Sequence, residues 1–66
     1  MEFNVGDHII LKEESVYFSF AGASGSLVKE VVKTDVKGTH FIKIGLITAG
    51  EIPYFRLKEY RLATEK

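Results

Sequence analysis

The 66-residue sequence contains no cysteine and no tryptophan, only one proline and one methionine, and its formal net charge is zero. Without cysteine the chain cannot form disulfides, thiolate zinc sites or a cysteine nucleophile, which fits a reducing compartment. No apolar run approaches the roughly 18 residues of a membrane-spanning helix. The first residues lack the basic start and apolar stretch of a signal peptide. We therefore expect a cytoplasmic protein without a membrane segment.

The length of the chain allows one domain over residues 1–66. With 45% hydrophobic and 27% charged residues, the composition is that of a folded domain. A chain this short buries only about 60% of the surface that its unfolded form exposes. Most large apolar side chains are therefore needed for a single small core, and little apolar surface is left for a deep pocket.

Short β-branched segments separated by turn residues predict an all-β fold. We expect strands at residues 8–12, 27–34, 39–44, 52–56 and 60–63, turns at 35–38 and 45–50, and one possible 3₁₀ turn at 57–60. A helix over 27–34 is the alternative, because apolar residues there also recur at helical spacing, but β-branching and flanking glycines favour a strand. The expected core consists of Val5, Ile9, Leu11, Leu27, Val31, Ile42, Ile44, Phe55, Leu57 and Leu62.

Three motifs in succession carry a resemblance to a known architecture. Val5-Gly6-Asp7 precedes an apolar strand, Gly22-x-x-Gly25 precedes Leu27, and Phe55-x-Leu57-x-x-Tyr60-x-Leu62 ends the series. This pattern resembles the SH3-like small barrels, including KOW-type modules. The resemblance implies a five-stranded antiparallel barrel, with an OB-like barrel as the alternative. In signalling SH3 domains the first long loop and a tryptophan bind proline-rich peptides, but tryptophan is absent here.

The sequence offers few side chains for catalysis. His8 and His40 are the only histidines, and no His-x-x-x-His, Gly-x-Ser-x-Gly or carboxylate cluster is present. Both histidines alternate with apolar neighbours, which predicts that they lie on the solvent face of their strands. Gly22-Ala-Ser-Gly25 lacks the lysine and helix of a phosphate-binding loop. We expect no enzyme, no metal and no cofactor.

Aromatic residues give the leading functional hypothesis. Tyr17, Phe18 and Phe20 fall within four residues of an expected loop, and Tyr54 is predicted nearby. Such a loop can fold back and close the barrel, or it can present aromatic contact area to a partner. We favour a non-catalytic module that binds a partner protein through these four residues.

The distribution of charge supports an alternative. Residues 1–28 carry one basic and four acidic side chains, net −3, and residues 29–66 carry eight basic and five acidic ones, net +3. A basic face beside Tyr54 and Tyr60 would suit single-stranded DNA or RNA, although a pI of about 6.7 is low for such a binder. The candidate residues are Lys29, Lys33, Lys43, Arg56 and Arg61.

The expected register also bears on self-association. Ile10, Val28 and Val32 alternate away from the expected core and would form an apolar stripe on the outer face. This predicts a weak homodimer through the stripe, or a bulge in the second strand that turns one valine inward. Otherwise we expect a monomer.

Overall fold

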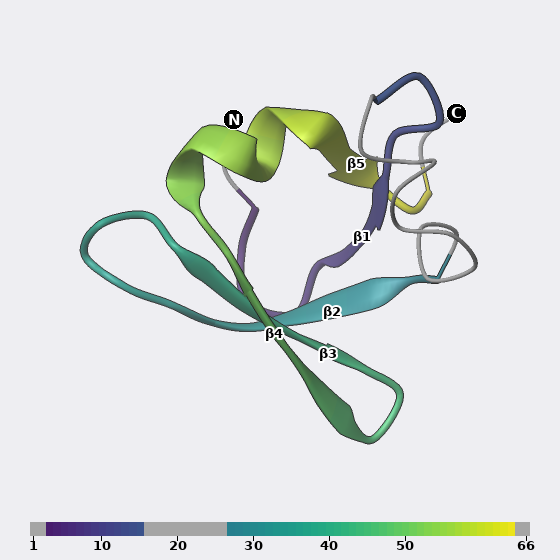
Figure 1. Ribbon diagram of the computed structural model, residues 1–66. Coiled ribbons are helices and arrows are strands. Elements are labelled where there is room, and N and C mark those ends of the chain that lie inside the picture. Colours follow the sequence, from purple (N-terminus) through teal and green to yellow (C-terminus); the bar gives the residue numbers. More distant parts are fainter. Residues whose placement is uncertain (1–2, 16–26, 65–66) are drawn as a thin grey trace.

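A computed structural model describes residues 3–15 and 27–64, which form one antiparallel sheet and a short helix (Figure 1). The strands are β1 (His8–Leu11), β2 (Lys29–Thr34), β3 (His40–Ile44), β4 (Ile47–Ile52) and β5 (Tyr60–Leu62), and the 3₁₀ helix η2 spans Tyr54–Glu59. The strand order in the sheet is β4-β3-β2-β1-β5. The predicted all-β fold with five antiparallel strands and a 3₁₀ turn is confirmed, although the sheet is not closed into a barrel over the described residues. The alternative helix over 27–34 is wrong.

A hydrogen-bonded turn joins the N-terminal segment to β1 and fastens it to β2. Gly6 has a φ of 97°, and Asp7 closes the turn by accepting the Asn4 N–H at Oδ2, 2.8 Å away. The Gly6 N–H donates to the Val31 carbonyl at 2.8 Å, and the Val31 N–H donates to the Asp7 carbonyl at 2.9 Å. These bonds hold the N-terminal segment beside β2.

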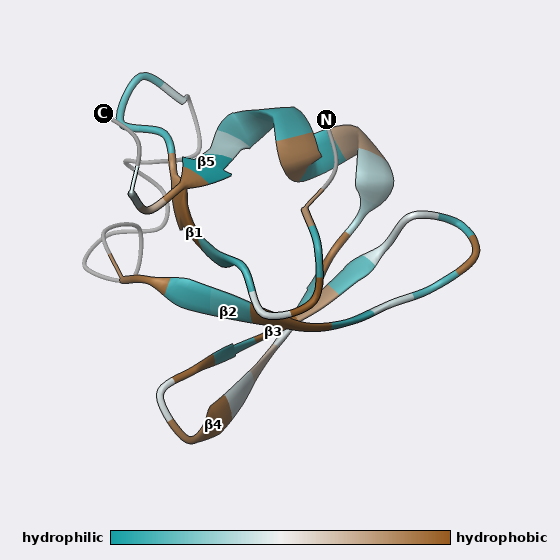
Figure 2. Ribbon diagram, turned by 180° about the vertical axis from the view of Figure 1, so that it is seen from behind, coloured by the Kyte–Doolittle hydropathy of each residue, from teal (hydrophilic) through white to brown (hydrophobic). Residues whose placement is uncertain are grey.

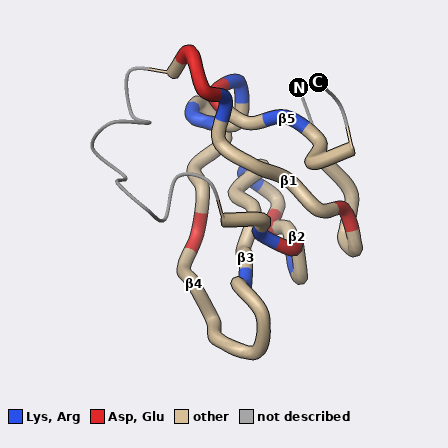
Figure 3. The backbone as a smooth tube through the Cα atoms, turned by 90° about the vertical axis from the view of Figure 1, so that its right-hand side faces the viewer, with Lys and Arg blue, Asp and Glu red and all other residues tan. Residues whose placement is uncertain are grey.

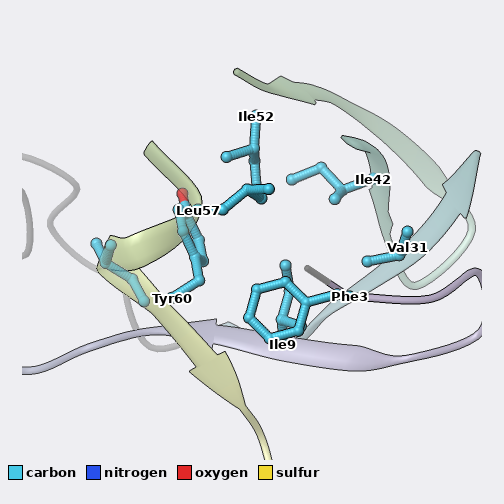
Figure 4. Packing of buried hydrophobic residues seen from close by; sticks show 8 residues of the cluster. Phe3, Ile9, Val31, Ile42, Ile52, Leu57 and Tyr60 are labelled. Carbon is cyan, nitrogen blue, oxygen red and sulfur yellow. The ribbon is translucent and has the colours of Figure 1, made fainter. Parts of the chain in front are cut away.

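The core lies between the bent sheet and η2 (Figure 4). Because side chains alternate along β1, Ile9 and Leu11 both point inward. The buried hydrophobic residues are Phe3, Ile9, Leu11, Val31, Ile42, Ile52, Leu57 and Tyr60. Five of the ten expected core residues are therefore confirmed, namely Ile9, Leu11, Val31, Ile42 and Leu57. Val5, Leu27 and Phe55 are instead exposed, while Ile44 and Leu62 are half-buried.

A bulge interrupts β2, as one of the two register alternatives predicts. The pairing shifts between Val31, opposite Ile42, and Lys33, opposite Phe41, so that Val32 has no partner of its own. The bulge does not turn a valine inward, because Val28 and Val32 are both exposed. That part of the prediction is wrong, and the homodimer stays a prediction.

The fourth strand begins five residues before its expected start at residue 52. Gly45 and Leu46 form the two-residue connection between the paired residues Ile44 and Ile47. Gly45 has a φ of 59°, and glycine at the first position of such a connection is typical of a type II′ hairpin turn. Residues 45–50, expected to be a turn, therefore contain this tight turn and most of β4.

The 3₁₀ helix η2 covers residues 54–59, of which 54–56 were expected to be strand and 57–59 to belong to a 3₁₀ turn. Pro53 precedes the helix with a φ of −60°, and the Arg56 N–H donates to the Pro53 carbonyl at 2.9 Å. In a 3₁₀ helix residues three apart share a face, and on the face of Tyr54, Leu57 and Tyr60 the last two are buried while Tyr54 is only partly covered. Phe55 and Lys58 lie on another face and are exposed.

Candidate functional site

Two exposed aromatic residues follow one another in the sequence at the start of η2. The side chain of Tyr54 is 53% exposed and that of Phe55 is 72% exposed. Together they are called the aromatic surface below. Of the four residues predicted to bind a partner, Tyr54 lies here, and its exposure was expected. Tyr17, Phe18 and Phe20 lie outside the described residues.

Pro53, which precedes it, and Gly38, in the turn between β2 and β3, fix the position of Tyr54. Pro53 sets the direction in which the chain leaves β4. The Tyr54 ring packs against Gly38 so closely that a Cβ atom at Gly38 would lie 2.7 Å from Tyr54 Cδ1. Gly38 also has a φ of 83°, a conformation that favours glycine. The position of Tyr54 in the aromatic surface is therefore constrained by Pro53 and Gly38.

The residues of the predicted basic face come from β2, β3, η2 and β5, and acidic residues occur along the same backbone (Figure 3). Lys29 is only 7% exposed, and its Nζ donates to the Leu27 carbonyl at 2.9 Å. The Nζ also lies 5.9 Å from the ring centroid of Tyr60. Burial lowers the pKa of Lys29 and raises that of Tyr60, the latter opposed in part by the charge of Arg56.

The other basic candidates make local contacts. Lys43 Nζ lies 3.7 Å from a carboxylate oxygen of Glu30, its cross-strand neighbour, and Lys33 Nζ lies 5.6 Å from the ring centroid of Phe41. Arg61 Nη1 donates to the Leu62 carbonyl at 3.1 Å, and Nη2 lies 4.0 Å from a Glu13 carboxylate oxygen. Phosphate binding would compete with these contacts.

His40 is buried, at 2% exposure, so the prediction that it faces solvent is wrong. Its Nδ1 lies 2.8 Å from the Gly38 carbonyl oxygen and its Nε2 lies 2.8 Å from the Phe3 carbonyl oxygen, and the nitrogen that carries the ring proton donates to its oxygen. The Phe3 N–H lies 3.3 Å from Nε2 and donates to that nitrogen when it carries no proton. The Phe3 ring meets the imidazole edge-on. The imidazole thus holds the N-terminal segment on the core, whereas His8 is exposed as expected.

A shallow pocket of about 290 Å³ lies beside this imidazole. Its walls come from the N-terminal segment and from the turn between β2 and β3. The Asp35 carboxylate at its edge is occupied by the turn itself, because Oδ1 accepts the N–H groups of Lys37 and Thr39 at 2.9 Å. The lining residues are Phe3, Asn4, Val5, Thr34, Asp35, Gly38 and His40.

The hairpin formed by β3 and β4 ends in apolar side chains that the sequence reasoning missed. Leu46 is 99% exposed and Ile47 is 73% exposed, and Figure 2 shows this end of β4 as hydrophobic. The sequence contained a signal for this hairpin, because the pair Gly45-Leu46 between two isoleucines is typical of a tight hairpin turn. Leu46 and Ile47 are called the hairpin tip below.

Within residues 3–15 and 27–64, no group of three or more histidine and carboxylate side chains could hold a metal ion. In the same residues no helix is long and apolar enough to cross a membrane. Comparison with protein-family models, curated proteins and solved structures found no match to this chain. The arguments for function therefore rest on the geometry described above.

Proposed function

We propose that this protein is a non-catalytic interaction module that binds a partner protein through the aromatic surface. The exposure of Phe55 is the observation that carries the proposal. Burying one such side chain stabilises a fold by about 1.5–3 kcal/mol, and a chain of this size has little apolar area to spare. Phe55 contributes little of that burial in the isolated chain and is available to a partner.

The constrained position of Tyr54 supports the same function. A tyrosine held between Pro53 and Gly38 loses little conformational freedom on binding, so less of the contact energy is lost to ordering. Tyr17, Phe18 and Phe20 are proposed to extend the contact area. For the fold, we propose the SH3-like architecture, supported by the Gly6-Asp7 turn before β1 and the 3₁₀ helix before β5.

Single-stranded nucleic acid is the weaker candidate. Several phosphates must be neutralised at once for appreciable affinity, whereas Lys29 is buried and Lys43 and Arg61 lie near carboxylates. These contacts weigh against a continuous phosphate-binding track.

Affinity capture from extracts of the source cells, with three immobilised proteins, tests the proposal. The proteins are the wild type, Phe55→Ser and the control Val36→Ser, which removes an exposed apolar side chain from the turn between β2 and β3. We expect a protein that the wild type and Val36→Ser retain and Phe55→Ser loses, without sensitivity to nuclease. Equal retention by all three proteins would contradict the proposal.

A titration of labelled oligonucleotides at two salt concentrations tests the alternative. A nucleic-acid binder should lose affinity steeply with salt, with a log–log slope of about −0.7 for each phosphate contact on a single strand. Lys33→Glu should then weaken binding. We expect no binding at low salt, and a steep slope abolished by Lys33→Glu would favour nucleic acid over protein.

A further inference from the structure

The two exposed apolar clusters lie at opposite ends of β4. The hairpin tip precedes the strand, and the aromatic surface follows it after Pro53. Figure 1 shows β4 running from the hairpin turn to η2. With a rise of about 3.4 Å per residue, the six residues of β4 separate the two clusters by a fixed span of roughly 17 Å.

β4 is also an edge strand, with β3 as its hydrogen-bonded neighbour in the described sheet. Its residues from Ile47 to Glu51 are all exposed. Edge strands are commonly protected from other chains by lysine or proline, but between Ile47 and Ile52 the only charged residue is Glu51 and there is no proline. Only the extra residue Ala49, at the register shift opposite Ile42 and Lys43, interrupts the regular edge.

We propose that a second copy of this chain pairs antiparallel with the edge of β4. Antiparallel pairing about a two-fold axis sets the start of one strand beside the end of the other. The hairpin tip of each copy then reaches the aromatic surface of the other, and one symmetric contact covers both apolar clusters. A parallel pairing would leave the clusters unmatched.

Charge is compatible with this arrangement. The chain has zero net charge, so two copies do not repel each other strongly. A pairing centred between Ala49 and Gly50 sets Glu51 of each copy opposite Thr48 of the other, so no like charges face each other across the strands.

The dimer is weak because the contact is small. A standard interface buries about 800 Å² on each partner, which is about a sixth of the 4623 Å² that the chain exposes. One edge strand and four side chains per copy cover less than that. This pairing of two copies rests on the proposed function in one respect, because it uses the same aromatic surface. A second copy and a partner protein would therefore compete for that surface.

Sedimentation equilibrium of the protein alone, from about 10 µM to about 1 mM, tests the pairing. We expect the apparent mass of the wild type to rise with concentration. Ile47→Lys should weaken dimerisation at least about tenfold, because it places two charges in the apolar contact. Val32→Lys is the matched control, since Val32 is exposed on β2 and away from the edge. It should leave dimerisation unchanged.

Two results would overturn the pairing. One is a wild type that stays monomeric at about 1 mM. The other is a dimer that Val32→Lys abolishes and Ile47→Lys does not, which would assign the contact to the outer face of β2. Neither result depends on a partner protein. Ile47→Lys should leave the capture of a partner protein intact, whereas Phe55→Ser should weaken both that capture and the dimerisation.

Discussion

Replacing His40 with phenylalanine tests how the fold is held at its N-terminal segment. Phenylalanine keeps a ring of similar size beside Phe3 but has no ring N–H, whereas a neutral imidazole donates one hydrogen bond, to the carbonyl of either Phe3 or Gly38. The Phe3 carbonyl is in a buried contact and the Gly38 carbonyl in a partly buried one. An unsatisfied buried acceptor costs about 1–3 kcal/mol, and a lost bond at a partly hydrated acceptor about 0.5–1.5 kcal/mol.

His40→Phe should therefore lower the free energy of unfolding by about 1–3 kcal/mol. A domain of this length has a total of about 3–10 kcal/mol, so the change is large. Urea unfolding followed by circular dichroism measures it as a lower midpoint. His8→Phe is the matched control, because His8 is exposed on β1, and it should change stability by less than about 0.5 kcal/mol. If His40→Phe were as stable as His8→Phe, the imidazole would not hold the N-terminal segment.

Gly38→Ala should destabilise the protein more than Gly6→Ala, because both glycines have positive φ but only at Gly38 would a Cβ clash with the Tyr54 ring; equal losses in urea unfolding would refute the clash. Lys29→Met should be more stable than the wild type at neutral pH. Burial lowers the pKa of Lys29, because the buried ammonium destabilises the folded wild type. As pH rises through the lowered pKa toward 10.5 the ammonium loses its proton, so the wild type should become more stable and the difference in stability between Lys29→Met and the wild type should shrink. Burial raises the pKa of Tyr60, so the contribution of Tyr60 to stability should fall as pH rises above 10, opposite in sign to that of Lys29, and Tyr60→Phe should remove that fall. Unfolding curves between pH 7 and pH 11 separate the two effects, and pH-independent differences would contradict both.

The strands near the N-terminus could be predicted because local pattern and burial agree there. Ile9 and Leu11 alternate with more exposed neighbours, and the Gly6-Asp7 turn fixes where β1 begins. The same rule should have placed His40 in the core, since His40, Ile42 and Ile44 share one face of β3. The prediction for His40 was wrong because it followed the polarity of histidine and not the alternation of side chains along the strand.

The region around β4 and η2 could not be placed by strand alternation. Phe55 and Leu57 alternate as in a strand, but a 3₁₀ helix with three residues per turn separates them and exposes Phe55. Pro53 marks this change of period in the sequence. The exposure of Leu46 and Ile47 follows from tertiary structure, because the hairpin extends beyond the core, and no local pattern specifies that.

The central claim is that Phe55 lies in a binding surface. Photo-crosslinking from position 55, with p-benzoylphenylalanine in place of Phe55 and a matched protein labelled at Val36, tests it most directly. In cell extract we expect an adduct with one partner protein from position 55 and none from position 36. In concentrated pure protein we expect an adduct from position 55 to Leu46 or Ile47 of a second copy. The absence of any adduct specific to position 55 in both experiments would contradict the claim.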